Sequence, residues 1–323
     1  MIRVLFLVHK YFDNMDNEFG GTTREFYSLV NAFKGDKEVK ITPCDNFDIK
    51  KIKEYRKNFD VIHSENMGAT MEMLRRGIHP DVIGPTAQSP GKNEKRWEEW
   101  KSLGINPQDY YKAIVVRNTN AEERINETWK NIRYIRLGVD TDELTTKHKI
   151  TSGTILWAGD VCREAKNFQM FIDIMKITTL PKGFQWKVLS GYKLKDYINT
   201  LETTSLLINT SSNETFCFAM FEANARGVPS IYKKGLHNPQ GHKDVREFHP
   251  NKRIQVEYTP EAYRDKILEL LNKPNELEKE RRYARGYVVQ NASYEVMKED
   301  FKKIYKEIYL KNQKVYKDKK INK

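Results

Sequence analysis

Two glutamates, Glu214 and Glu222, lie in a strand–loop–helix segment that constrains the fold of this chain more than any other stretch. The segment spans residues 209–231 and reads NTSSNETFCFAMFEANARGVPSI. An apolar strand is predicted first, then a loop that carries Glu214, and then a helix from about Phe216 that carries Glu222 and stops at Gly227. This order is typical of an open α/β sheet, in which ligands bind beyond the carboxyl ends of the strands.

The spacing of the two glutamates fits the needs of a nucleotide-sugar ligand. Ribose and sugar hydroxyls need acceptors, which carboxylates supply, and a diphosphate needs donors, which a helix N-terminus supplies. A structural alternative stays open, in which Ser211-x-x-Glu214 is a helix capping box and Glu222 is a solvated helix residue.

The same segment resembles a known sequence motif. Glu214, the seven-residue spacer, Glu222, Ala223, Gly227, Val228 and Pro229 resemble the paired-glutamate motif of retaining GT-B glycosyltransferases, specifically the group-one (family four-like) enzymes that use nucleotide-diphosphate sugars. The resemblance implies that Glu214 contacts the transferred sugar and that Glu222 holds the ribose hydroxyls. It also implies that backbone amides face the sugar and diphosphate, at Thr215, Phe216, Cys217 and Phe218.

The resemblance implies an α/β fold of the GT-B type: two Rossmann-like domains facing across a cleft, with a C-terminal helix crossing back to the first domain. With 323 residues, 39% of them hydrophobic, the chain is long enough for two such cores. We expect an N-terminal acceptor domain over residues 1–148, a nucleotide-sugar domain over 149–292, and a returning helix with a mobile basic tail over 293–323.

The first domain is expected to open with a buried strand, a diglycine loop and an amphipathic helix. Gly20 and Gly21 precede the helix, and Thr22 with Glu25 predicts a capping box at its start. In the resembled family this loop lines the cleft. The resemblance therefore makes Gly20, Gly21 and Thr22 donor-side candidates and Arg24 an acceptor-side candidate.

Further acceptor-side candidates follow predicted strands of the first domain: His63, Gln88, Ser89, Trp97 and Arg117. His63 at such a position is more often structural. Gln88 or Ser89 stands where the resembled family often places a histidine. Trp97 lies on a predicted helix and either stacks on a sugar or base or packs on its own domain.

The second domain is expected to open with a strand, Thr154–Ala158, and a loop that ends before a helix. Gly159 at the strand end and Lys166 before the helix place a cation and amides where a diphosphate would lie. By resemblance Lys166 binds the donor diphosphate, and Arg163 supplies the second positive charge because Asp160 replaces the family's arginine. Glu214, Lys166 and Arg163 are thus the candidate catalytic residues. A later helix is predicted over 196–206.

No metal site or separate cofactor is expected. The pair Asp140-x-Asp142 is assigned to a connection between domains, and His237, His242 and His249 do not follow a zinc-binding pattern. The cysteines Cys44, Cys162 and Cys217 fit neither a disulfide framework nor a zinc site. A UDP- or GDP-sugar is expected as substrate.

The net charge of +12 is weak evidence about partners. Residues 1–150 hold 25 Lys and Arg against 23 Asp and Glu, so the excess lies in the C-terminal half. No apolar run is long enough for a transmembrane segment and no signal pattern is present, which predicts a cytoplasmic location.

The sequence therefore predicts a retaining, metal-independent glycosyltransferase of the hexosyltransferase type. Its acceptor is unknown: a glycan, a lipid, a small molecule or nucleic acid. Two alternatives stay open, a transferase acting on a modified DNA base and a catalytically silent GT-B protein that binds sugar nucleotides. A GT-B epimerase is a third alternative.

Overall fold

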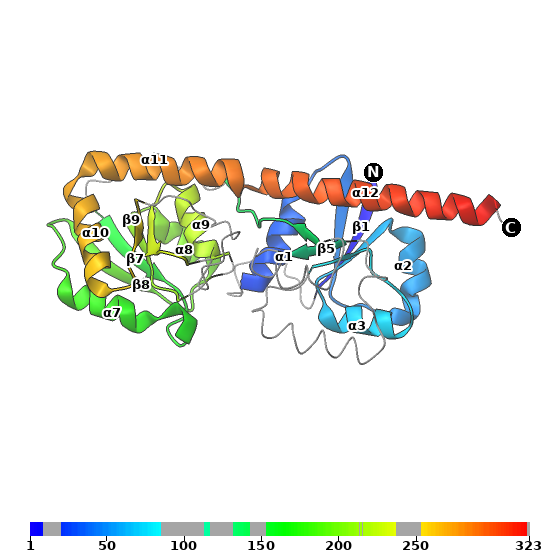
Figure 1. Cartoon of the computed structure of the whole chain (residues 1–323), viewed down its shortest axis with the longest axis horizontal. Helices are drawn as coiled ribbons and strands as arrows, with labels where there is room; N and C mark the ends of the chain where they lie inside the picture. Colours follow the sequence, from blue (N-terminus) through cyan, green and yellow to red (C-terminus); the bar gives the residue numbers. More distant parts are fainter. Residues whose placement is uncertain are drawn as a thin grey trace. The chain divides into compact units, whose positions relative to one another are not determined.

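A computed structural model describes residues 1–8, 21–84, 113–116, 132–142, 153–212, 214, 216–236 and 253–321 (Figure 1). The chain forms two compact units. The first contains the described parts of residues 1–13, 25–137 and 295–323, and the second those of 14–24 and 138–294. Each unit is built on its own parallel sheet.

The sheet of the first unit has the strand order β2-β1-β3-β4-β5-β6, and every neighbouring pair is parallel. The described elements of this unit are β1 (Ile2–Leu7), α1 (Gly21–Ala32), β2 (Val39–Cys44), η2 (Ile49–Lys51), α2 (Ile52–Asn58), β3 (Val61–Ser64), α3 (Met67–Arg75), β4 (Val82–Ile83), β5 (Ala113–Val116), β6 (Ile132–Tyr134) and α12 (Tyr294–Ile321). The first residues of α1, up to Arg24, and the first residue of α12 belong to the second unit. Strands β1 and β3 are buried at nearly every position, as expected for a parallel sheet with both faces covered.

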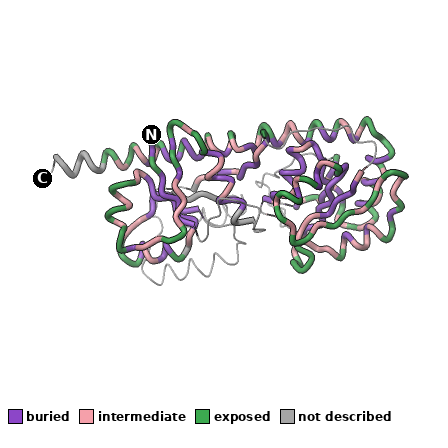
Figure 2. Tube along the Cα trace, turned by 180° about the vertical axis from the view of Figure 1, so that it is seen from behind, coloured by how far each residue is buried: buried purple, intermediate pink, exposed green. Residues whose placement is uncertain are grey.

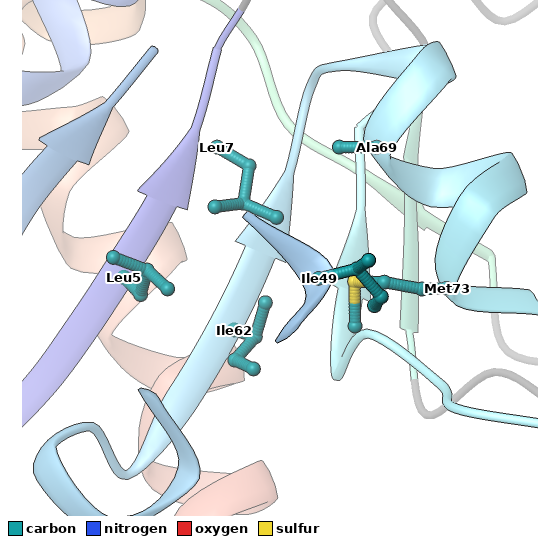
Figure 3. Close-up of a cluster of buried hydrophobic side chains, with 6 residues drawn as sticks. All are labelled: Leu5, Leu7, Ile49, Ile62, Ala69 and Met73. Atoms are coloured by element: carbon teal, nitrogen blue, oxygen red, sulfur yellow. The ribbon is translucent and has the colours of Figure 1, made fainter. Parts of the chain in front are cut away.

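Strand β1 sends its side chains into two cores, because successive residues of a strand point to opposite faces. Leu5 and Leu7 join one hydrophobic cluster, whose other buried members are Ile49, Ile62, Ala69 and Met73 (Figure 3). Phe6 points to the other core, where its ring lies 5.8 Å from that of Phe26 and 4.9 Å from that of His63.

The helix α12 packs on the first unit through an apolar stripe whose residues recur at helical spacing. Met297, Phe301, Ile304, Tyr305 and Ile308 are all buried. The ring of Phe301 lies 5.6 Å from that of His63. The helix continues to Ile321, through most of the segment expected to be a basic tail. No glycine or proline interrupts residues 311–321, so nothing local stops the helix.

The sheet of the second unit has the order β11-β10-β9-β7-β8 and is also parallel throughout. Its described elements are β7 (Gly153–Ala158), η3 (Glu164–Lys166), α7 (Phe168–Ile177), β8 (Phe184–Leu189), α8 (Leu194–Leu201), β9 (Thr204–Asn209), α9 (Phe218–Ala225), β10 (Ser230–Lys233), β11 (Gln255–Val256), α10 (Pro260–Asn272) and α11 (Pro274–Asn291). Helix α7 packs on α10, and α9 packs on α11.

Burial in the second sheet falls from its centre to its edge. All six residues of β9 are buried, whereas β8, an edge strand, has none. The buried parts of the trace gather in the interior of each unit (Figure 2). The helix predicted over 196–206 is too long, since α8 ends at Leu201 and residues 204–206 belong to β9. Thr204 opens a run that is buried at every position and pairs with both β7 and β10, and this tertiary pairing overrides the local helical preference.

In the described part of the chain, no helix combines the length and apolar character needed to cross a membrane.

Candidate functional site

The strand order of the second sheet places a topological switch point between β7 and β9. The chain passes from β7 to its neighbour β8 on one side, and then returns to β9 on the other side of β7. Loops that leave the carboxyl ends of two such strands diverge and open the crevice in which α/β sheets bind ligands. The candidate residues Gly159, Lys166 and Glu214 follow these two strands.

The loop after β7 ends in a sharply turned residue that fixes the position of Lys166. Lys166 is the last residue of η3, and Asn167 next to it has a left-handed backbone with φ of 45°. The Asn167 side chain caps α7 by accepting a hydrogen bond from the Met170 amide at 3.2 Å. Asparagine tolerates this conformation better than most residues.

The loop after β9 is bonded directly to the loop after β7. The Thr210 hydroxyl donates to the Lys166 carbonyl at 2.9 Å, and the Ser212 amide donates to the Ala165 carbonyl at 2.9 Å. The indole of Trp157 in β7 donates to the Thr210 hydroxyl at 2.8 Å. These bonds hold the two loops in one arrangement.

Lys166 and Glu214 form an ion pair across the two loops. The Lys166 ammonium contacts Oε1 of Glu214, and the two side chains are only 19% and 11% exposed. The same carboxylate oxygen accepts a hydrogen bond from the Ser211 hydroxyl at 2.7 Å. Burial lowers the pKa of Lys166, but the Glu214 carboxylate outweighs this effect, and the pKa is raised.

The capping-box interpretation of Ser211 and Glu214 is wrong. Helix α9 begins at Phe218, several residues after Ser211, and its N-cap residue is Cys217. The Ser211 hydroxyl bonds the Glu214 side chain instead of a helix amide. A similar correction applies to Thr22, because α1 already begins at Gly21 and Thr22 is therefore inside the helix.

Cys217 shapes the entry into α9. It has a left-handed backbone with φ of 56°, and its sulfur accepts a hydrogen bond from the Asn209 amide group at 3.0 Å. Burial raises the pKa of the Cys217 thiol to about 12, so this group is a neutral thiol at physiological pH. The first amides of α9 follow it directly, and such amides have no partner within their own helix.

Glu222 is buried in the second turn of α9, which excludes its interpretation as a solvated helix residue. It is 6% exposed, and its Oε2 accepts a hydrogen bond from Nη1 of Arg24 at 2.9 Å. Arg24, which belongs to the same compact unit, is also 6% exposed. Burial raises the pKa of Glu222, and the Arg24 guanidinium opposes this shift.

Tyr192 is a residue of this site that the sequence analysis missed. It follows the carboxyl end of β8, just after Gly191 with its positive φ of 60°. Its hydroxyl interacts electrostatically with Arg24, Glu222, Cys217 and Lys166, and burial raises its pKa to about 12. The available signal was the position of Tyr192 directly after Ser190-Gly191, a pair that ends the predicted strand at the same edge of the sheet as Gly159.

The other described candidates differ in their surroundings. Arg163 is exposed, and its charge acts to lower the pKa of Lys166, so it lies near the ion pair. Phe216 is buried and stacks on Phe221 with ring centroids 4.3 Å apart, so its ring belongs to the core. Phe218 is also buried, and its ring packs edge-on against Phe216. Gly159 lies against the Trp157 ring, because a Cβ at this position would be 3.0 Å from it.

His63 is fully buried in the first unit. Its Nδ1 lies 2.8 Å from the Tyr305 hydroxyl and its Nε2 lies 3.4 Å from Oε1 of Glu65. This burial favours the structural interpretation of His63. Several other candidates lie outside the described residues: Gly20, Gln88, Ser89, Trp97, Arg117 and Thr215, together with the Thr22 side chain and the three histidines of residues 237–249.

The fold of this chain is similar to that of several solved structures. Sucrose-phosphate synthase from Thermosynechococcus elongatus superposes with a TM-score of 0.68 at 12% identity, covering 96% of this chain and 100% of that one. HepE of Anabaena, in complex with UDP and glucose, superposes with a TM-score of 0.69 at 11% identity, covering 94% and 99% of the two chains. The chain has the GT-B fold.

A third GT-B structure is similar over nearly the whole chain. It is an α-glucosyltransferase in complex with UDP and a 13-mer DNA, with a TM-score of 0.63 at 12% identity, covering 94% of this chain and 99% of that one. No protein-family model matches the sequence, and no curated protein matches it. At these identities the comparisons establish the GT-B fold, and they do not identify the reaction.

Proposed function

We propose that the protein is a glycosyltransferase that moves a sugar, with retention, from a nucleotide-diphosphate donor to an acceptor hydroxyl. The observation that carries the proposal is the Lys166–Glu214 ion pair at the switch point of the second sheet. Two bonded loops hold a cation and a carboxylate there. The cation is suited to the diphosphate and the carboxylate to the sugar, on either side of the bond that is broken. The GT-B structures that match nearly the whole chain support this choice.

The charges of the site suit departure of a diphosphate. When the bond between the anomeric carbon and the diphosphate breaks, negative charge develops on the leaving oxygen. Lys166 and Arg163, together with the first amides of α9, would stabilise that charge. These groups supply the positive charge without a metal ion, so we propose metal-independent transfer.

The two carboxylates would divide the recognition of the donor between them. Glu214, tied by Ser211 and Lys166, is placed to accept hydrogen bonds from the transferred sugar and to orient it for attack. Glu222, in the second turn of α9, would accept hydrogen bonds from the ribose hydroxyls. The donor would displace part of the existing ion pairs when it binds.

We propose a UDP- or GDP-hexose as donor, with UDP favoured because three of the similar structures were solved with UDP. The acceptor is proposed only as a hydroxyl compound. One similar structure carries DNA, and another was solved with α-GlcNAc-glycerol, so fold similarity does not select among acceptor classes. Neither transfer to DNA nor a catalytically silent protein is favoured by a specific observation.

The test is a screen of the purified protein against UDP- and GDP-sugars, following its melting temperature and the release of nucleoside diphosphate. We expect one donor to stabilise the protein and to be turned over. Glu214→Gln and Lys166→Met should each lower turnover by about 100-fold or more. Glu276→Gln, which removes the acid of an exposed ion pair on α11, is the matched control and should retain activity.

Three outcomes distinguish the alternatives. Full turnover in both site variants would refute the assignment of the site. Donor binding without any turnover would support the catalytically silent protein. The anomeric configuration of the product, read by NMR, decides retention against inversion.

A further inference from the structure

Tyr192 lies at the candidate site but has no role in the proposed transfer of the sugar. The carboxyl ends of β7 and β8 are level, because Ala158 pairs with Leu189. The Gly159 amide donates to the Leu189 carbonyl at 3.0 Å, and the Val161 amide donates to the Ser190 hydroxyl at 3.3 Å. The end of β8 is thus fixed to the loop that leads to Lys166.

One face of the Tyr192 ring is held by the protein. The ring stacks on Tyr197 with centroids 5.2 Å apart and an interplanar angle of 29°. Tyr197 is fully buried, and its hydroxyl donates to the Ala219 carbonyl in the first turn of α9. Tyr192 itself is only partly buried. It is therefore an aromatic surface backed by the core and fixed against the helix that carries Glu222.

A planar cation lies over the Tyr192 ring. The Arg24 guanidinium carbon is 5.8 Å from the ring centroid, and the same guanidinium donates to Glu222. A planar group that stacks on Tyr192 can therefore reach the Glu222 carboxylate with hydrogen-bond donors at the same time. A nucleoside has the same two parts, a planar base and a ribose that carries hydroxyl donors.

We propose that Tyr192 is the residue on which the nucleobase of the donor stacks while Glu222 holds the ribose. This inference rests on the proposed function, which it extends from the diphosphate to the base. Because β8 is the edge strand, no further strand lies beyond it in the described sheet to supply another wall. Stacking is tolerant of base identity, so Tyr192 would add affinity for both uracil and guanine donors.

The test uses the full chain, with UDP, GDP and inorganic pyrophosphate as ligands in calorimetric titrations. Tyr192→Leu keeps apolar bulk against Tyr197 but removes the aromatic face, whereas Tyr192→Phe keeps that face. We expect Tyr192→Leu to weaken nucleoside diphosphate binding by about tenfold. Tyr192→Phe should stay within about threefold of the parent protein, as should Tyr283→Leu, an exposed tyrosine on α11.

Pyrophosphate separates a lost stacking surface from a damaged fold, because it has no base. Its affinity should be the same in the parent protein and in both Tyr192 variants. Unchanged UDP and GDP affinity in Tyr192→Leu would overturn the assignment, and so would an equal loss of affinity for pyrophosphate. If the parent protein bound and turned over no nucleotide sugar, the proposed function itself would fail, whereas normal turnover with unchanged binding in Tyr192→Leu refutes only the role of Tyr192.

Discussion

At the scale of single residues, the site is defined by charges that are partly removed from water. Lys166 and Glu214 are each less than one-fifth exposed, so neither charge is well solvated without the other. Removing one member of such a pair leaves the other carrying the desolvation cost, which is larger than the net contribution of the intact pair. The same reasoning applies to Glu222 and Arg24.

Lys166→Met should lower the free energy of unfolding by about 3 kcal/mol at neutral pH, because it removes the cation that pairs with the poorly solvated Glu214 carboxylate. The pKa of Lys166 is raised in the folded protein above its ordinary value of 10.5. The stabilisation is therefore fully present below that value and is lost as the pH rises through the folded pKa. Urea unfolding at pH 7, 9 and 11 should show similar differences between parent and variant at the first two values and a smaller one at pH 11.

Lys279→Met is the control for this series, because Lys279 pairs with Glu276 at an exposed site on α11. Its effect should be less than about 1 kcal/mol at all three pH values. An effect of Lys166→Met as small as that of the control would show that the site pair is well solvated.

The cysteines should differ in reactivity, because only the thiolate reacts. Burial raises the pKa of Cys217 to about 12, whereas Cys162 is exposed. At pH 8 iodoacetamide should alkylate Cys162 in the folded protein and leave Cys217 intact, as followed by peptide mass spectrometry. In concentrated urea both should react, and rapid labelling of Cys217 in the folded state would contradict the raised pKa of its thiol.

At the scale of elements, the site depends on how the loop after β7 enters α7. Asn167 combines a left-handed backbone with a side chain that caps the helix, and its amide group also donates to the Tyr258 hydroxyl at 2.7 Å. That hydroxyl donates in turn to the Thr210 carbonyl at 2.7 Å. The residue after Lys166 therefore links both loops of the site.

Substitutions at Asn167 should separate the backbone effect from the side-chain effect. Asn167→Gly loses the cap but keeps easy access to positive φ, whereas Asn167→Ala loses the cap and must also adopt a left-handed conformation. We expect Ala to cost about 1 kcal/mol more than Gly in the free energy of unfolding. Chemical denaturation of the three proteins measures this difference, and equal stability of the two variants would mean that the loop relaxes to negative φ.

At the scale of the whole molecule, each compact unit has its own sheet and its own buried core. The core of the first unit includes Phe301 and Tyr305 of α12, so a segment at the end of the chain completes a unit that begins with β1. The candidate donor residues belong to the second unit. A change in one core and a ligand of the other unit should therefore act on different parts of the chain.

Phe301→Ala should destabilise the first unit by about 3–5 kcal/mol, because it leaves a cavity beside His63. UDP at a hundred times its dissociation constant should stabilise the second unit by about 2.7 kcal/mol. Hydrogen exchange followed by mass spectrometry should show faster exchange in β3 peptides of the variant and slower exchange in β9 peptides of the parent with UDP. Equal protection of β3 and β9 by UDP would show that the two units unfold together.

The GT-B fold was expected from the resemblance that the paired glutamates carry, and the similarity to solved GT-B structures confirms it. Local patterns predicted individual elements. The strand expected over Thr154–Ala158 is β7, and the strand and helix expected at the start of the first domain are β1 and α1. These features are properties of short segments, since hydrophobic period and turn chemistry act over a few residues.

The partners of each functional side chain were decided only by the tertiary structure. A glutamate in a helix is usually exposed to solvent, yet Glu222 is buried and bonded to Arg24, 198 positions away in the sequence. Tyr192 gains its position from the register of β8 beside β7, and Ser211 bonds the Glu214 side chain where a capping box was considered. The sequence by itself determined most of the strands and helices, because that choice is largely local, but residues 204–206 became part of a strand through tertiary pairing. The register of parallel strands joined by long crossovers determined which side chains meet, and no short stretch of sequence contains that information.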